Sequence, residues 1–135
     1  MLRIMSDNDV QGHVSRLMDI CQAAPWADLW SDLGCVLWTF ADLDLPDDAT
    51  DAAVWQACQE NEVLLITGNR NAEGPESLET TIRQRNRSNR LPVLTLANPG
   101  RIARDRAYAE SVVERLFDVL VDVEVFRGTG RLFLP

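Results

Sequence analysis

The stretch VLLITGNRN, at residues 63–71, decides the fold class of this chain. Its apolar first half lacks the polar alternation of a half-exposed strand, and its polar second half contains a glycine and two asparagines. A continuous apolar run of this length is typical of a parallel strand that helices cover on both faces. We therefore expect a buried strand over Val63–Thr67 and a polar loop over Gly68–Pro75.

Further extended and helical segments alternate on either side of this strand. Apolar runs predict additional strands at Leu2–Ser6, Cys35–Phe40 and Pro92–Ala97. Apolar spacing and capping residues predict the helices, which are Val10–Cys21, Trp26–Leu33, Asp51–Glu60, Glu76–Arg87 and a long one that opens at Asn98. The final segments flank a glycine-containing turn and predict a hairpin of Val123–Phe126 and Arg131–Leu134.

Alternation of strands and helices at this spacing favours a parallel sheet with helices on both faces. The length of 135 residues suits a single domain, residues 1–135, with one core. We therefore expect a three-layer α/β/α fold of the α/β class. Its sheet should be mainly parallel, with four to five strands, and the chain should close with a C-terminal hairpin.

The charged residues narrow the function classes. The net charge is −8, which argues against a general phosphate-binding surface. All 13 cationic side chains are arginines, so mechanisms that need a catalytic or phosphate-binding lysine are excluded. Arginines cluster between Arg83 and Arg106. They predict either a solvated face that offsets the acidic first half, or a rim for nucleic-acid phosphates or an acidic partner.

The cysteine and histidine contents limit the metal and redox classes. The single histidine excludes a histidine-rich zinc site, and the three cysteines without CxxC spacing favour buried thiols in a reducing compartment. No apolar run approaches the ~20 residues of a membrane span, and the first residues lack the pattern of a signal peptide. We therefore expect a cytoplasmic protein that does not associate with membranes.

Polar side chains follow the expected strands at their carboxyl ends. Asp7 and Asp9 come after the first strand, and Thr67, Asn69 and Asn71 lie at the end of the third. Ligands of parallel sheets bind beyond these ends, near a switch in strand order. Converging carboxylates repel one another, and a hard cation such as Mg²⁺ relieves that repulsion through oxygen ligands. The sequence thus predicts a functional site at this edge of the sheet.

Local structure offers another explanation for most of these residues. Asp9 precedes a helix and could be its cap, and Asp51 lies in a first helical turn, where a carboxylate favours the dipole. Asn69 and Asn71 are also common in loops with left-handed geometry. Asp7 directly follows a buried strand and has no such local role, so it is the strongest site candidate.

Short stretches of the chain resemble the motifs of PIN-like domains, the small nuclease-type domains found as toxins of toxin–antitoxin pairs. These stretches are Ile4–Val10, Thr50–Trp55 and Leu64–Asn71. The resemblance implies that Asp7 is the first metal-binding acid and that Asp51 is the acid that opens the middle helix. Asn69 and Asn71 stand where the family usually has aspartates, and asparagine offers a carbonyl ligand without charge.

The resemblance further implies a site in which Asp7 and Asp51 are catalytic and hold Mg²⁺ or Mn²⁺ with the help of Asn69. The residues that would bind the substrate, single-stranded RNA, are Thr67, Asn69, Arg70 and Asn71. An antitoxin-like protein and a second copy of the chain could be its partners.

The two asparagines separate the functional hypotheses. Because they replace acids, we expect a PIN-like protein with an eroded metal site and weak or absent nuclease activity. The alternative is an active Mg²⁺- or Mn²⁺-dependent ribonuclease. A phospho-receiver domain is the remote alternative, since receivers need a lysine and this chain has none.

Overall fold

The computed structural model describes residues 1–135 and places a parallel sheet at the centre of the chain. Its strands are β1 (Leu2–Ser6), β2 (Cys35–Trp38), β3 (Val63–Thr67), β4 (Val93–Leu96) and β5 (Arg131–Leu134). They lie in the order β2-β1-β3-β4-β5, and every neighbouring pair is parallel. The predicted parallel sheet is therefore confirmed, with five strands.

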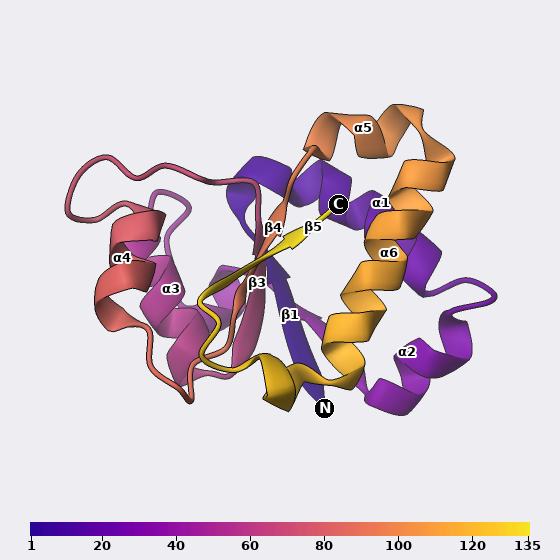
Figure 1. Ribbon diagram of the computed structural model, residues 1–135, viewed down its shortest axis with the longest axis horizontal. Helices are drawn as coiled ribbons and strands as arrows, with labels where there is room; N and C mark the ends of the chain where they lie inside the picture. Colours follow the sequence, from indigo (N-terminus) through magenta and orange to yellow (C-terminus); the bar gives the residue numbers. More distant parts are fainter.

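The helices form a layer on each side of the sheet (Figure 1), which confirms the three-layer α/β/α fold. One layer consists of α1 (Gln11–Cys21), α2 (Ala27–Leu33), α5 (Pro99–Arg104) and α6 (Arg106–Val121). The other consists of α3 (Asp51–Glu60) and α4 (Leu78–Arg85). Short 3-10 turns complete the chain at η1 (Asn8–Val10), η2 (Ala41–Leu43) and η3 (Val123–Phe126).

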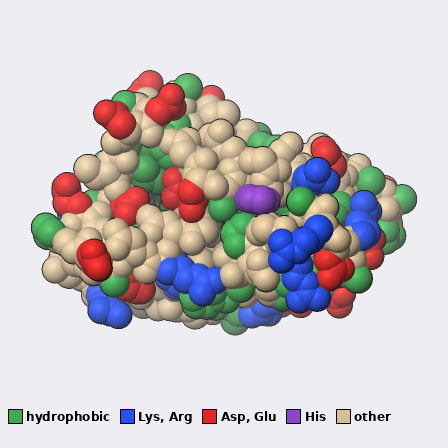
Figure 2. Space-filling view, turned by 90° about the horizontal axis from the view of Figure 1, so that it is seen from above, with side chains coloured by type: hydrophobic (Ala, Val, Ile, Leu, Met, Phe, Trp, Pro, Cys, Tyr) green, Lys and Arg blue, Asp and Glu red, His purple; other side chains and the backbone are tan.

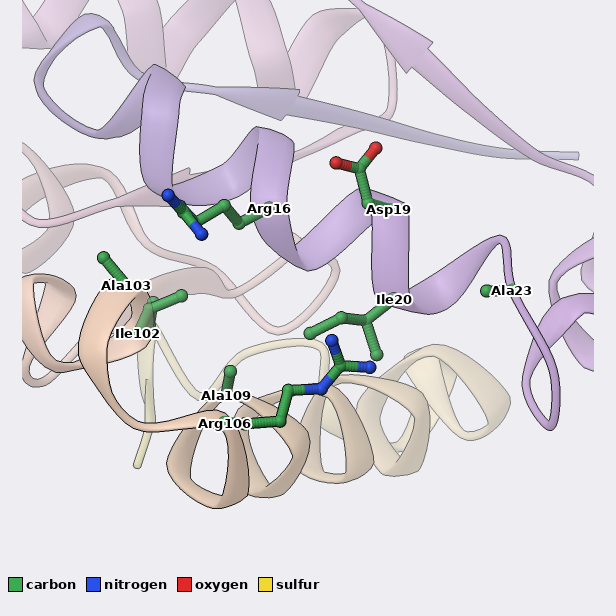
Figure 3. A pocket seen from close by; sticks show the side chains of 8 residues that line it. All are labelled: Arg16, Asp19, Ile20, Ala23, Ile102, Ala103, Arg106 and Ala109. Carbon is green, nitrogen blue, oxygen red and sulfur yellow. The ribbon is translucent and has the colours of Figure 1, made fainter.

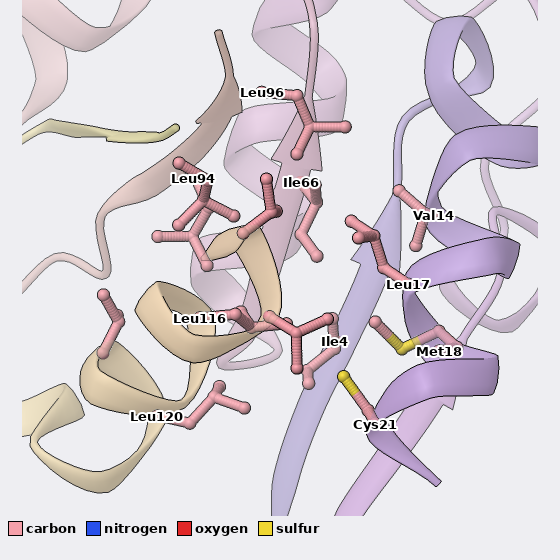
Figure 4. Packing of buried hydrophobic residues seen from close by; sticks show 14 of the residues in the cluster. Ile4, Val14, Leu17, Met18, Cys21, Ile66, Leu94, Leu96, Leu116 and Leu120 are labelled. Atoms are coloured by element: carbon pink, nitrogen blue, oxygen red, sulfur yellow. The ribbon is translucent and has the colours of Figure 1, made fainter. Parts of the chain in front are cut away.

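Successive side chains of the central strands face two different cores. Ile4 and Ile66 belong to the larger core, which α1 and α6 cover (Figure 4). Met5 and Leu65 belong to the second core, which α3 and α4 cover. Burial on both faces explains why β3 is apolar from Val63 to Ile66, since all of its residues are buried and only the last, Thr67, is polar.

The strand order switches direction at the centre of the sheet. From β1 the chain moves outward to β2, then returns to β3 and continues outward through β4 to β5. β1 and β3 therefore lie side by side at the switch point, where Met5 pairs with Leu65. Their carboxyl ends are the position at which doubly wound sheets bind ligands.

The prediction of a closing hairpin is wrong. Val123–Phe126 is a 3-10 turn, and Arg131–Leu134 pairs in parallel with β4. A parallel partner needs a long crossover, which α5 and α6 provide. Leu134 is fully buried in the larger core, so its apolar side chain is accommodated only when this strand joins the sheet.

The long helix expected from Asn98 is divided into α5 and α6. The break lies at Asp105, whose backbone is extended and whose carboxylate accepts a hydrogen bond from the Tyr108 amide at 3.1 Å. Asn98 makes no side-chain capping bond, whereas Pro99 takes the first helical position as predicted. The second strand is also shorter than expected and ends at Trp38. No helix combines the length and apolar character needed to cross a membrane.

Candidate functional site

A chain of hydrogen bonds joins predicted site residues at the switch point of the sheet. The Thr67 hydroxyl, at the end of β3, donates to Oδ2 of Asp7 at 2.9 Å. The same hydroxyl accepts from the backbone amide of Asn69 at 3.0 Å. The Asn69 side chain then donates to Oδ2 of Asp51 at 3.0 Å. Residues from β1, β3 and α3 thus meet at one edge, as the sequence predicted.

Asp7 is placed by the ladder between β1 and β3. Its backbone amide donates to the Ile66 carbonyl at 2.8 Å, which extends the pairing by one residue. Its carboxylate accepts from the Asn8 amide at 2.8 Å, and Asp7 is the residue that caps η1. Asp7 therefore does have a local role, which the sequence did not indicate, in addition to its contact with Thr67.

Asp9 does not cap the following helix, so that prediction is wrong. Helix α1 begins after Val10 without a side-chain capping bond. Oδ2 of Asp9 instead accepts from the Gly68 amide at 3.2 Å, across the switch point. A Cβ atom at Gly68 would lie 3.1 Å from that oxygen and 3.0 Å from the Val10 side chain. Glycine therefore lets the ends of β1 and β3 approach this closely.

Asp51 connects α3 to the loop after β3 and to α4. Thr50 caps α3 by accepting from the Ala53 amide at 3.2 Å. The Asp51 carboxylate is thereby free to accept from the Asn69 side chain and, at 3.2 Å, from the Leu78 amide at the start of α4. Asp51 thereby accepts from an N–H group in the first turn of α4, where backbone N–H groups have no partner within the helix.

The orientation of the Asn69 amide is fixed by contacts at both of its ends. Its oxygen accepts from the backbone amide of Asn71 at 2.8 Å, and a backbone amide can only donate. The NH₂ group must therefore face Asp51. A flipped amide would place two donors together at one end and two acceptors at the other. Asn69 thus presents hydrogen, not oxygen, to the Asp51 carboxylate.

The carboxylates at the switch point are held in an unfavourable environment. Partial burial raises the pKa of Asp7, and the nearby charge of Asp51 raises it further, although the bonds from Thr67 and Asn8 oppose this. The pKa of Asp9 is also raised, first by partial burial and then by the charge of Asp7. Perturbed acids of this kind often mark functional sites.

The residues present do not form a built centre for a divalent cation. No group of at least three histidine, cysteine, aspartate or glutamate side chains is arranged to hold a metal ion. Oδ2 of the Asp51 carboxylate accepts from two N–H donors, one of them from Asn69. The sequence-based prediction that Asp7, Asp51 and Asn69 hold Mg²⁺ or Mn²⁺ stays a prediction, and this arrangement does not favour it.

The other predicted substrate-binding residues lie on opposite sides of this network. The Asn71 side chain accepts from the Glu73 amide at 3.0 Å and stabilises the loop that leads to α4. Arg70 lies toward β4 and β5, where it donates to the Ala97 carbonyl and its guanidinium is 5.3 Å from the centre of the Phe133 ring. The structure therefore brings Thr67 and Asn69 to the carboxylates but not Arg70.

Sequence reasoning missed Arg131, which supports the loop from β5. Its side chain is only 10% exposed, and Nη1 donates to the Asn69 carbonyl at 2.9 Å and to the Thr95 hydroxyl at 2.6 Å. Glu79 of α4 lies 3.6 Å from Nε, and burial lowers the pKa of Arg131. The sequence feature that could have identified Arg131 is its position as the first residue of an otherwise apolar strand.

A polar hollow adjoins the network. It measures about 410 Å³ and lies between the start of α3, at Thr50 and Asp51, and the loop from Asn71 to Ser77. A hollow of about 430 Å³ lies elsewhere, between α1 and the α5–α6 pair, and Arg16 and Arg106 flank it (Figure 3). That second hollow contains none of the predicted site residues.

Charge is unevenly distributed over the face that contains the carboxyl ends of the strands. Figure 2 shows acidic side chains on one side of this face and arginines gathered on the other. The arginines between Arg83 and Arg106 do not form one surface, because α4 ends before β4 and α5 begins after it. Arg83 and Arg85 thus lie at the opposite end of the sheet from Arg101 and Arg104.

No protein-family model, curated protein or solved structure matches the chain. The resemblance to PIN-like domains therefore rests on its motif residues alone. Of these, Asp7, Asp51 and Asn69 are the ones that the hydrogen-bond network brings together.

Proposed function

We propose that the protein is a PIN-like domain with an eroded metal site and weak or absent nuclease activity. The placement of the motif residues supports this proposal. Asp7 and Asp51 belong to one hydrogen-bonded network at the switch point, although they are far apart in sequence. Asn69 lies between them, at the position where the family usually has an acid.

The observation that carries the proposal is the hydrogen bond from Asn69 to Asp51. A divalent cation neutralises neighbouring carboxylates and needs oxygen ligands around it. Here N–H groups from Asn69 and Leu78 already donate to Oδ2 of Asp51, so this oxygen has hydrogen-bond partners without a metal ion. Asn69 also lacks the negative charge of the acid that the family usually has there, which weakens the attraction of the site for a hard cation.

An active Mg²⁺- or Mn²⁺-dependent ribonuclease is the second candidate. The nearby charge of Asp51 contributes to the raised pKa of Asp7, so these carboxylates are close enough to interact. Acids that repel each other in this way bind a cation more readily than isolated ones. A bound cation would supply the activation of a water molecule for phosphodiester hydrolysis.

A phospho-receiver domain remains the remote alternative, and the site argues against it. Its common strand order, 2-1-3-4-5, is also the order of this sheet, so the topology agrees with a receiver and the objection comes from the site residues. A receiver would need an aspartate after the third strand, where this chain has Gly68 and Asn69, and a lysine, which is absent. An antitoxin-like protein, a second copy of the chain and a cytoplasmic location stay proposals.

The decisive experiment measures Mn²⁺ binding and RNA cleavage together. Calorimetry should detect no micromolar Mn²⁺ site in the unmodified protein, and single-stranded RNA should remain intact or be cut very slowly in Mg²⁺ or Mn²⁺. The variant Asn69→Asp restores a third carboxylate and should bind Mn²⁺ at least about tenfold more tightly. Asn89→Asp adds the same charge at an exposed loop position and serves as the matched control.

The ribonuclease candidate predicts the opposite pattern. The unmodified protein would then bind Mn²⁺ at micromolar concentration and cut RNA, and EDTA or Asp7→Asn would abolish the cleavage. That result would replace our proposal. Cleavage that survives both treatments would exclude metal-dependent hydrolysis at this site and would therefore contradict both candidates.

A further inference from the structure

A cationic and aromatic cluster lies at the β4–β5 end of the same sheet edge. We call Arg70, Arg131 and Phe133 the β5 platform. Arg131 and Phe133 are two residues apart on β5, so their side chains share one face of the strand. Arg70 follows β3 and crosses to this end, where its guanidinium lies over the Phe133 ring at 5.3 Å.

Phe133 is exposed without an evident structural reason. β5 is an edge strand, and 50% of the Phe133 surface is accessible, whereas Leu134 next to it is fully buried. Helix α4 reaches Arg131 through Glu79, at 3.6 Å, but Phe133 belongs to neither hydrophobic core. An accessible aromatic ring beside a guanidinium group is a typical surface for stacking a nucleic-acid base.

Arg70 retains donors for a negatively charged ligand. It donates to the Ala97 carbonyl, and it forms none of the ion pairs found in the structure. The Arg70 guanidinium lies over the ring of Phe133, which is two residues from Arg131 on β5, so both guanidinium groups lie at this end of the sheet edge. A phosphate at this end would therefore contact the positive charge of Arg70, which no carboxylate neutralises, beside Arg131, which pairs with Glu79.

The loop after β3 connects the platform to the carboxylates. The Asn69 carbonyl accepts from Arg131 at 2.9 Å, and its side chain donates to Asp51 at 3.0 Å. A ligand on the platform would therefore lie beside the Asp7–Asp51 network, separated from it by the Thr67–Asn71 segment.

We infer that the β5 platform binds single-stranded nucleic acid, with a base stacked on Phe133 and a phosphate on Arg70. This deepens the proposed function, on which it rests for the neighbouring carboxylates. A duplex is disfavoured because its bases are already stacked and because the net charge of −8 repels a dense polyanion. A protein partner would need a larger apolar area than one ring provides.

The test uses fluorescence anisotropy with labelled oligouridylate and oligothymidylate of about 12 nucleotides, in EDTA and at about 50 mM salt. The unmodified protein should bind at least one of the two strands. Phe133→Leu keeps an apolar side chain but removes the ring, and should weaken binding about tenfold. Phe133→Tyr keeps the ring and should bind within about twofold of the unmodified protein.

Arg70 has a matched control elsewhere in the chain. Arg115 lies over the Phe126 ring at 5.5 Å, in the same type of contact but away from the sheet edge. Arg70→Ala should weaken binding and lower the slope of log affinity against log salt by about one, whereas Arg115→Ala should change neither.

Two results would overturn the inference. One is the absence of binding to both strands, and the other is binding that Phe133→Leu and Arg70→Ala leave unchanged relative to their controls. Because EDTA is present throughout, neither result depends on the metal site. If the β5 platform does not bind nucleic acid, the Mn²⁺ binding and RNA cleavage measurements still test the proposed function separately.

Discussion

The β1–β3 end of the sheet edge carries the carboxylates of Asp7 and Asp51, whereas the β4–β5 end carries the guanidinium groups of Arg70 and Arg131. One residue bonds to both ends. Asn69 donates to Asp51 through its side chain and accepts from Arg131 through its carbonyl, at 3.0 and 2.9 Å. The comparison teaches that an acidic protein can separate opposite charges along one edge by placing neutral amide groups between them.

The largest expected effect on stability comes from replacing Arg131, at the β4–β5 end of the sheet edge. Arg131→Met leaves Glu79 without its partner and the Asn69 carbonyl without its donor, and we expect a loss of about 3 kcal/mol in the free energy of unfolding. Urea denaturation measures it. The control is Arg106→Met, which removes an ion pair with Glu110. Because the Arg106 side chain is 70% exposed, this variant should lose at most about 0.5 kcal/mol in the free energy of unfolding. Equal losses would contradict a structural role for Arg131.

Removing the Thr67 hydroxyl tests the hydrogen-bond network at the β1–β3 end of the sheet edge. Thr67→Val keeps the shape of a fully buried side chain but removes the donor to Asp7 and the acceptor for the Asn69 amide. We expect a loss of about 2 kcal/mol in the free energy of unfolding. Thr129→Val deletes an exposed hydroxyl that donates to the Phe126 carbonyl, and should cost about 0.5 kcal/mol. The prediction fails if denaturation shows no difference between the two variants.

Gly68→Ala tests how tightly the two strand ends approach each other. The added methyl would lie 3.0 Å from Val10 and 3.1 Å from Asp9, and we expect a loss of about 1 kcal/mol. Gly12→Ala has open space around the new methyl within α1, and should instead stabilise by about 0.5 kcal/mol. Thermal denaturation of both variants gives the signs, and a stabilising Gly68→Ala would show that the strand ends have room to spare.

The smallest effect concerns the charge on Asp7. Its pKa is raised in the folded protein by partial burial, so the stability linked to its protonated form is present below the unfolded pKa and is lost as pH rises through the folded pKa. Asp7→Asn cannot ionise, and its stability relative to the unmodified protein should therefore increase between about pH 4 and about pH 7. Denaturation at both pH values measures the trend, with the exposed Asp122→Asn as the charge-matched control. A trend in the opposite direction would mean that the folded state favours the carboxylate.

Local pattern predicted most of the fold. The apolar runs of β1 and β3 both depend on residues close in sequence. The hairpin failed because apolar spacing predicts a strand but not its partner or direction. The break at Asp105 was missed because the apolar spacing of α6 continues without an obvious stop. These failures concern long-range pairing and a single backbone conformation.

The candidate site was predicted in part. Asp7 and Asn69 were found from their positions at strand ends, the family resemblance added a metal-binding role for Asp51, and the structure brings all three into one network. Arg131 and Phe133 were not found, because Arg131 meets Asn69 across 62 residues of sequence and no short motif contains both. The capping assignments at Asp7 and Asp9 were also reversed, since either carboxylate could reach a nearby amide.

The parallel docking of β5 has a consequence for the order in which a newly made chain acquires its parts. A ribosome synthesises the first four strands and both helical layers before it reaches Arg131. Until β5 joins β4, the Asn69 carbonyl and the Thr95 hydroxyl lack their guanidinium partner. The loop that separates the charges would therefore take its final shape only after β5 has been synthesised and has paired with β4.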